Sequence, residues 1–271
     1  MAPSPETSRT ALVTGASAGI GAAVAREYAR RGWDVALAAR RAEPMEALAD
    51  ELRASHGVRA EVFAGADLFD PETPARLYGE VVARMGTVDG LVNNAGYGHP
   101  GRYLASPWED HARFIQLMLT APSQLAHLAS ASMKARGFGR IMNVASLAGH
   151  LPGTDGHTLY AAVKSYLVKF SQSLNAELKG TGVYVSALCP GFTFTEFHDV
   201  NGTRDNLNQL PGFMMQSAEA VAKSGVDALE RNKAVHVTGA VNKTIAAAAR
   251  LMPGAMSQNL MEKNSSRFRE Q

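Results

Sequence analysis

Hydrophobic and polar positions follow two alternating patterns along the chain. Short runs of β-branched or apolar residues are separated by longer segments in which apolar positions recur at helical spacing. This alternation is typical of β-α-β units around a parallel sheet. It predicts strands at residues 11–14, 34–38, 59–63, 90–93, 140–144, 183–188 and 235–237, and helices at residues 19–31, 43–56, 71–85, 107–136, 159–180 and 218–231.

These elements fit one α/β domain with a single seven-stranded sheet. No Ser/Gly linker, composition break or internal repeat divides the 271 residues, so one domain is favoured over two. Residues 1–9 are expected to form a flexible tail. Residues 190–216 lack a clear period, and long irregular segments in compact domains are usually functional. Because this segment follows a parallel strand, we predict that it is a substrate lid.

Composition narrows the possible partners and location. The chain is 46% hydrophobic and 19% charged, which indicates a substantial core and excludes a disordered protein. A net charge of +2 gives no strong field for nucleic acid. The single cysteine, the lack of zinc-like spacing and the lack of a signal-peptide pattern predict a cytoplasmic protein without a metal site. No apolar run reaches the length of a transmembrane segment. Residues 241–261 are interpreted as a packed or interfacial helix rather than a membrane-associated one.

A glycine-rich turn lies between the first predicted strand and the first predicted helix. The sequence there is TGASAGIG, residues 14–21. Gly15 suits a tight turn, Gly19 lets backbone N–H groups approach a pyrophosphate, and Gly21 lets helix and strand pack closely. The helix N-terminus also favours negative charge. The turn therefore predicts a dinucleotide site, with an ordinary strand-helix turn as the alternative.

Two arginines at the end of the second predicted strand indicate which dinucleotide is bound. An acidic residue at this place would bind a ribose 2′-hydroxyl, but the chain carries Arg40 and Arg41. Guanidinium groups suit a 2′-phosphate, so NADP(H) is predicted over NAD(H). The alternative is that the arginines, Arg41 above all, are solvated surface residues.

Three residues are candidates for the chemistry. Tyr160 and Lys164 are four apart in a predicted helix, so they share one face. A lysine cation favours the tyrosinate and is expected to lower the tyrosine pKa, which makes Tyr160 a usable general acid and base. Ser146, just past the fifth predicted strand, is placed to donate a hydrogen bond to a carbonyl oxygen. Each residue alone has a purely structural interpretation, and their occurrence together with a nucleotide turn favours the catalytic one.

Taken together, these motifs resemble the short-chain dehydrogenase/reductase family over nearly the full length of the chain. The resemblance rests on the glycine-rich turn, Asp67, the Asn-Asn-Ala-Gly run at 93–96, Ser146, the YAAVK run at 160–164, and Pro190-Gly191 with Thr195. It implies a three-layer Rossmann-type fold with a seven-stranded parallel sheet. It also implies a homodimer or homotetramer.

The resemblance assigns roles to individual residues. Tyr160 would protonate the substrate oxygen, Ser146 would hold that oxygen, and Lys164 would bind the nicotinamide ribose. The nicotinamide supplies hydride, so the protein provides positioning and electrostatics. The cofactor-binding residues would be Gly15, Ser17, Ala18, Gly19, Ile20, Gly21, Arg40, Arg41, Asp67, Leu68, Asn94, Ala95, Gly96, Tyr160, Lys164, Pro190, Gly191 and Thr195.

One position departs from the family pattern. Met118 stands where the family usually has an asparagine, a fourth catalytic residue that helps hold a water linked to the lysine. Pro122 lacks the N–H that would bond the Met118 carbonyl in a regular helix, so that oxygen is expected to remain available to the water. We predict an enzyme that is weakened rather than inactive. The alternative is that Met118 simply fills the core.

The residues near the predicted site favour a hydrophobic substrate. The candidate substrate-binding residues are mainly aromatic and apolar, and suit a ketone, an aldehyde or a secondary alcohol: Tyr97, Leu147, His150, His157, Phe192, Phe197 and Phe213. The predicted function is therefore an NADP(H)-dependent carbonyl reductase or alcohol dehydrogenase. Alternatives are a reductase of 3-oxoacyl thioesters or steroid-like ketones, and a weakly active NADP-binding scaffold or sensor.

Overall fold

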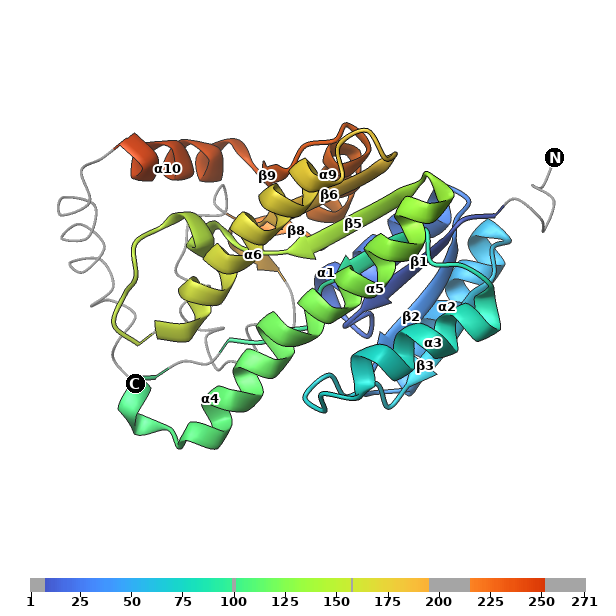
Figure 1. Cartoon of the computed structure of the whole chain (residues 1–271), viewed down its shortest axis with the longest axis horizontal. Helices are drawn as coiled ribbons and strands as arrows, with labels where there is room; N and C mark the ends of the chain where they lie inside the picture. Colours follow the sequence, from blue (N-terminus) through green and yellow to red (C-terminus); the bar gives the residue numbers. More distant parts are fainter. Residues whose placement is uncertain (1–7, 99–100, 157, 195–214, 252–271) are drawn as a thin grey trace.

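Seven parallel strands form one sheet in the computed structural model of the chain, which describes residues 8–98, 101–156, 158–194 and 215–251. The strand order is β3-β2-β1-β4-β5-β6-β9 (Figure 1). The strands are β1 (Thr10–Thr14), β2 (Asp34–Ala39), β3 (Ala60–Ala64), β4 (Gly90–Asn93), β5 (Gly139–Val144), β6 (Val183–Cys189) and β9 (Val235–Val237). The predicted single-domain fold with seven parallel strands is confirmed. The order reverses between β1 and β4, and open α/β sheets bind ligands at such a point.

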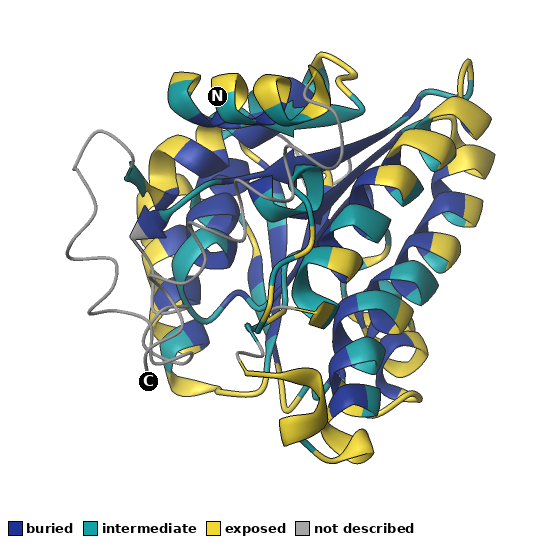
Figure 2. Ribbon diagram, turned by 90° about the vertical axis from the view of Figure 1, so that its left-hand side faces the viewer, coloured by how far each residue is buried: buried dark blue, intermediate teal, exposed yellow. Residues whose placement is uncertain are grey.

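Helices cover both faces of the sheet and bury its strands (Figure 2). One face packs against α1 (Gly19–Arg30), α2 (Glu43–His56) and α9 (Ala218–Glu230). The other packs against α3 (Thr73–Met85), α4 (Trp108–Ile115), α5 (Ala121–Arg136) and α6 (Thr158–Glu177). The helix α10 (Ala240–Leu251) follows β9 and contacts the short helix η3 (Leu147–His150). The remaining described elements are η1 (Tyr103–Ala105) and a two-stranded pair of β7 (Thr193–Phe194) with β8 (Gln216–Ser217).

The predicted helix at 107–136 is interrupted by a wider turn. Between α4 and α5 lies the π-helical turn η2 (Gln116–Thr120), where the Ala121 N–H donates to the Gln116 carbonyl. Pro122 has no N–H for the α-helical ladder at this place. The chain instead takes the five-residue spacing of a π-helix, which is common at functional sites. Met118 lies inside this turn.

Buried amides fix α6 on the sheet. The Asn93 Nδ2 in β4 donates to Asn143 Oδ1 in β5 at 2.8 Å, and Asn143 Nδ2 donates to Ser171 Oγ in α6 at 2.9 Å. Ser171 Oγ in turn donates to the Leu167 carbonyl at 2.7 Å. Asn143 and Ser171 are fully buried, so these bonds form away from competing water. They set the position of the helix that carries Tyr160 and Lys164.

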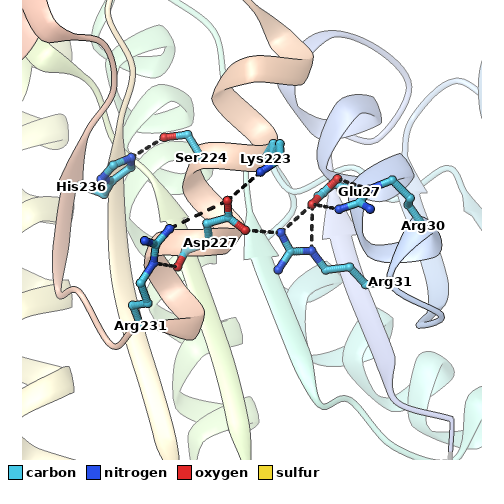
Figure 3. Close-up of polar contacts among 8 residues, drawn as sticks. All are labelled: Glu27, Arg30, Arg31, Lys223, Ser224, Asp227, Arg231 and His236. Atoms are coloured by element: carbon cyan, nitrogen blue, oxygen red, sulfur yellow. Dashed lines mark hydrogen bonds and ion pairs between the residues drawn. The ribbon is translucent and has the colours of Figure 1, made fainter.

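A chain of ion pairs joins α1 to α9 (Figure 3). The Arg31 guanidinium lies 2.6 Å from Glu27 and 2.5 Å from Asp227. Glu27 is buried, and its hydrogen bonds to Arg30 and Arg31 hold the pKa of its carboxyl below the ordinary value despite the opposing effect of burial. Arg31 therefore bridges a buried carboxylate on one helix and a carboxylate on the other.

Part of the sequence prediction lies outside the described residues. Of the predicted tail at 1–9, the structure describes residues 8–9, and of the predicted lid at 190–216 it describes 190–194 and 215–216. Within the described ranges, no helix is long and apolar enough to cross a membrane.

Replacing Arg31 with methionine tests the bridge between α1 and α9. Arg31→Met leaves the buried Glu27 carboxylate short of a partner, so we expect the free energy of unfolding to fall by about 1–3 kcal/mol in urea titrations. The matched control is Lys223→Met, because Lys223 pairs with the same Asp227 carboxylate but its side chain is 64% exposed. That control is expected to change stability by less than about 0.5 kcal/mol. Equal losses in both variants would contradict the bridge.

Candidate active site

The glycine-rich turn after β1 is tied to the loop after β4 by one hydroxyl and one amide. Thr14 Oγ1 donates to the Val92 carbonyl at 3.1 Å and accepts from the backbone N–H groups of Asn94 and Ala95 at 3.0 and 3.1 Å. Asn94 Nδ2 donates to the carbonyls of Thr14 and Gly15. The predicted cofactor-binding residues Asn94 and Ala95 therefore lie directly against the turn.

Two glycines of the turn have no room for a side chain. A Cβ at Gly21 would lie 2.3 Å from the Gly15 carbonyl oxygen. Gly15 has a φ of +64° and would place a Cβ 2.8 Å from Asn94 Nδ2. The helix α1 that follows has no acidic residue in its first turn, and Ala18 at its N-cap supplies no capping side chain. Its first N–H groups therefore suit an anionic ligand.

The end of β2 carries the two predicted arginines at the same edge of the sheet. Arg41 Nη2 donates to Ser17 Oγ at 3.2 Å, which brings the guanidinium to the glycine-rich turn. The Arg40 guanidinium carbon lies 5.7 Å from the centroid of the Phe69 ring. Both arginines are exposed. The two cations and the helix N-terminus thus form one positively charged region.

The ends of β2 and β3 lie together, which places the other residues predicted near the adenosine. The Ala66 N–H donates to the Ala39 carbonyl at 3.2 Å. Leu68 is buried, and Asp67 Oδ1 accepts from the Phe69 N–H at 3.3 Å. The sequence prediction missed Phe69 and Arg113 of α4, whose guanidinium carbon lies 4.7 Å from the same ring centroid. No spacing rule links residues 69 and 113, so the sequence carried no signal for this contact.

The structure brings Ser146, Tyr160 and Lys164 together. Ser146 ends the run after β5, and its Oγ accepts from the Ala148 N–H at 3.1 Å as the cap of η3. Its side chain also hydrogen-bonds the Tyr160 hydroxyl. Lys164 Nζ lies 5.6 Å from the Tyr160 ring centroid and donates to the Val144 carbonyl at 2.8 Å. A serine, a tyrosine and a buried lysine therefore meet at the carboxyl end of β5.

Burial controls the ionisation of this group. Burial raises the pKa of Tyr160 above its ordinary value, and the hydrogen bond from Ser146 offsets this only partly. The sequence-based expectation of a lowered tyrosine pKa is wrong for this structure. Burial also lowers the pKa of Lys164 to about 8, although the Cys189 thiol opposes the shift. Near neutral pH, Tyr160 is thus a neutral phenol able to give up a proton.

Cys189 closes β6 beside this group. The thiol is fully buried, and burial raises its pKa to about 12, while Lys164 acts in the opposite direction. A neutral thiol at this place is chemically inert.

Met118 packs beneath the loop that follows β4. Its side chain is buried, and its Sδ would lie 2.7 Å from a Cβ at Gly96, so the thioether rests directly on that glycine. Met118 also lines a cavity of about 10 Å³, which is at the lower limit of the space that one water molecule needs. Lys164 and Asn93 line the same cavity, and among the described residues Asn93 Oδ1 is buried without a hydrogen-bond partner.

The predicted substrate-binding residues are distributed unevenly. Leu147 is buried next to Ser146, and its N–H donates to the Pro190 carbonyl at 2.8 Å, which brings the Pro190-Gly191 turn to the catalytic group. Phe192, half-buried, follows that turn. Tyr97 instead packs edge-on against Phe69 and Phe114, at centroid distances of 5.8 and 5.3 Å.

His150 is influenced by charges on α6 and α10. Burial lowers the pKa of its imidazole, and the charges of Arg250 in α10 and Lys169 in α6 act in the same direction. His157, Thr195, Phe197 and Phe213 lie outside the described residues.

The lowered pKa of Lys164 gives stability a defined pH dependence. Below about pH 8 the buried ammonium is charged and costs stability, so we expect Lys164→Met to melt at a higher temperature than the parent. Between about pH 8 and the unfolded value of 10.5, the folded protein binds fewer protons than the unfolded chain. The parent therefore gains stability with pH, and the difference in Tm should shrink.

Thermal unfolding at pH values across this range measures that difference. Lys169→Met is the matched control, because Lys169 is exposed on the same helix. Its Tm difference from the parent should stay constant. A constant difference for Lys164→Met as well would show that the ammonium is not desolvated.

Comparison with known proteins identifies the family. A model of the short chain dehydrogenase family matches residues 9–205. An uncharacterized oxidoreductase of Myxococcus xanthus is 36% identical over 217 residues, which cover 80% of this chain and 82% of that protein. Nodulation protein G of Rhizobium sp. is 35% identical over 236 residues, covering 86% of this chain and 94% of its own.

Solved structures agree with these relatives. A short-chain dehydrogenase from Sphingobium yanoikuyae, solved in complex with NADPH, has a TM-score of 0.78 at 33% identity and covers 92% of this chain and 95% of its own. A bulky-bulky ketone specific alcohol dehydrogenase from Comamonas testosteroni has a TM-score of 0.74 at 31% identity, covering 92% of this chain and 94% of its own. The chain belongs to the short-chain dehydrogenase/reductase family of oxidoreductases.

Proposed function

We propose that the protein is an NADP(H)-dependent oxidoreductase that transfers hydride between the nicotinamide and a hydrophobic ketone or aldehyde, or the corresponding alcohol. The observation that carries this proposal is the meeting of Ser146, Tyr160 and Lys164 at the edge of the sheet that also holds the glycine-rich turn. The cofactor fits this edge, because α1 begins there without a capping side chain or an acidic residue in its first turn, which leaves its N-terminal N–H groups suited to phosphate.

The proposed roles of the residues follow from their protonation states. The bound cofactor supplies the hydride that reaches the carbonyl carbon. Ser146 Oγ hydrogen-bonds the substrate oxygen, and the Tyr160 hydroxyl gives its proton to that oxygen as the new C–H bond forms. The raised pKa of Tyr160 keeps the proton in place until the oxygen becomes basic. Lys164, on the next turn of α6, would bind ribose hydroxyls and stabilise the tyrosinate left behind.

Preference for NADP(H) rests on charge at the end of β2. Arg41 donates to Ser17 Oγ, and the guanidinium carbons of Arg40 and Arg113 lie 5.7 and 4.7 Å from the centroid of the Phe69 ring. Guanidinium groups and a hydroxyl match the oxygens of a 2′-phosphate. The Sphingobium yanoikuyae relative was solved with NADPH, which supports the same choice.

The position of Met118 supports a working but slower enzyme. The cavity shared by Met118, Lys164 and Asn93 suits one water, and Asn93 Oδ1 offers that water an acceptor. A proton path from Lys164 therefore has a place to begin without the usual asparagine amide. The Met118 carbonyl, which lies in the π-helical turn η2, is proposed as a further ligand of this water.

The substrate is proposed to be a hydrophobic carbonyl compound. Leu147 follows Ser146, Phe192 follows the Pro190-Gly191 turn that Leu147 contacts, and the Comamonas testosteroni relative is described as specific for bulky-bulky ketones. Reduction of a 3-oxoacyl thioester or a steroid-like ketone is the alternative within this chemistry. We further propose a cytoplasmic homodimer or homotetramer. An exposed apolar surface at η1 and the start of α4, with Leu104 at 93% and Trp108 at 60% exposure, supports an interface.

Turnover against a panel of aryl and alkyl ketones and aldehydes tests the proposal. We expect the parent to oxidise NADPH, measured as loss of nicotinamide absorbance, and to do so faster than NADH. Tyr160→Phe keeps the ring but lacks the proton donor, and should lose at least about a hundredfold in kcat. Activity that survives Tyr160→Phe would contradict the assigned chemistry.

Met118→Asn in the same assay separates the enzyme from its rival. If the protein is a working enzyme with a partial water relay, the parent should turn over substrate, and Met118→Asn should do so at a higher rate. The rival is a cofactor-binding scaffold or sensor, and the observation that favours it is Met118 filling the space against Gly96. Turnover confined to Met118→Asn would support that rival.

Cofactor preference is tested independently of substrate by Arg40→Asp. The new carboxylate repels the 2′-phosphate and removes a charge-assisted hydrogen bond, so NADPH affinity should fall by about tenfold to a hundredfold. NADH carries no such phosphate and serves as the internal control, with little change expected. Fluorescence titration of both reduced cofactors measures the effect, and equal losses for both would refute the 2′-phosphate assignment.

A further inference from the structure

The turn after β6 rests on a buried amide from α10. A Cβ placed at Gly191 would lie 2.3–2.5 Å from the Asn242 side-chain amide atoms, so the Gly191 backbone and the amide are in direct contact. Asn242 is 3% exposed. Its amide therefore fixes how close the turn can come to α10.

One side chain and one main-chain carbonyl hold this amide in place. Asn242 Nδ2 donates to the Thr238 carbonyl at 2.9 Å and to Gln216 Oε1 at 3.3 Å. Thr238 Oγ1 also donates to Gln216 Oε1, at 2.5 Å. Gln216 belongs to β8, whose backbone N–H donates to the Phe192 carbonyl at 3.0 Å. We call Gln216, Thr238 and Asn242 the Asn242 cluster, and it connects β8, the end of β9 and α10 behind one turn.

The Asn242 cluster lies on the same side of the sheet edge as Ser146. The Pro190 carbonyl accepts from the Leu147 N–H at 2.8 Å, and Leu147 follows Ser146. In the sheet order, β6 and β9 lie on the far side of β1 from β2 and β3, which carry Arg40 and Asp67 near their ends. The cluster thus supports the part of the sheet edge near Ser146, and it lies away from the charged region at Arg40.

We propose that Asn242 is a positioning residue. It holds the backbone of the Pro190-Gly191 turn in the position that the nicotinamide half of the cofactor requires. This inference rests on the proposed function, because it takes a nicotinamide dinucleotide as the ligand. The amide acts through Gly191 and does not itself touch the reacting atoms. Shifts of about 1 Å in such supports slow reactions by up to about a hundredfold.

The physical basis is a buried amide whose bonds cannot be replaced by water. Asn242→Ala removes the atoms on which Gly191 rests and leaves Gln216 Oε1 with one fewer donor. Asn242→Asp keeps the shape but places an acceptor against the Thr238 carbonyl and Gln216 Oε1, which disfavours the native arrangement. In both variants the turn loses its fixed support.

Fragment binding distinguishes positioning from a general loss of structure. NADPH affinity is measured by fluorescence titration, and the affinity for adenosine 2′,5′-bisphosphate by competition. For Asn242→Ala and Asn242→Asp we expect about a tenfold loss of NADPH affinity with little change for the bisphosphate, which lacks the nicotinamide half. The rate of hydride transfer in a single turnover should fall further than the bisphosphate affinity does.

Matched variants keep the outcome clear. Lys243→Ala, at an exposed position of the same helix, should bind both ligands as the parent does. Thr238→Val removes only the hydroxyl that donates to Gln216 Oε1, and should show a smaller loss in the same direction even if the Asn242 variants fail to fold.

Three results would overturn the inference. Unchanged NADPH affinity in folded variants would show that the amide does not position the turn. Equal losses for NADPH and the bisphosphate would show a structural defect without selectivity. A parent that binds no NADPH would refute the proposed function and this inference with it, whereas a parent that binds NADPH confines any failure to Asn242.

Discussion

The candidate site depends on the contact between the glycine-rich turn after β1 and the loop after β4. One hydroxyl, Thr14 Oγ1, bonds three backbone groups there, and Asn94 returns two bonds to the turn. Without a side chain at Gly21, the first helix can approach closely enough for its N-terminus to face the same space. The glycine-rich turn, the N-terminus of α1 and the loop beside Met118 therefore form as one unit, and a change in either loop would move the other.

Much of this arrangement was predictable from local pattern. The strands and helices were predicted from the spacing of apolar residues. Each element buries one face against a neighbour, so its apolar residues recur with the period of a helix or a strand. The pairing of Tyr160 with Lys164 followed from helical spacing, and Ser146 from its place after a strand. These signals depend on residues close together in the sequence, so they can be recognised without a structure.

The parts that were missed depend on contacts between distant segments. The π-helical turn around Met118 was read as continuous helix, since one proline does not reveal how the chain absorbs its missing N–H. The tyrosine pKa was predicted from the neighbouring lysine alone, whereas burial, which is set by the whole fold, decides its direction. Arg113 at Phe69 and Asn242 beneath Gly191 join residues that are 44 and 51 positions apart in the sequence.

The single thiol offers a natural measure of motion at the catalytic end of the sheet. Cys189 is fully buried at the end of β6, with a pKa raised to about 12. It cannot react while it stays packed in the buried cluster that includes Leu167 and Val168 of α6. Its rate of alkylation by an external reagent therefore reports how often this packing opens, and a ligand that stabilises the packing would lower that rate. The reactivity of this thiol thus reports transient opening of the structure next to the candidate active site.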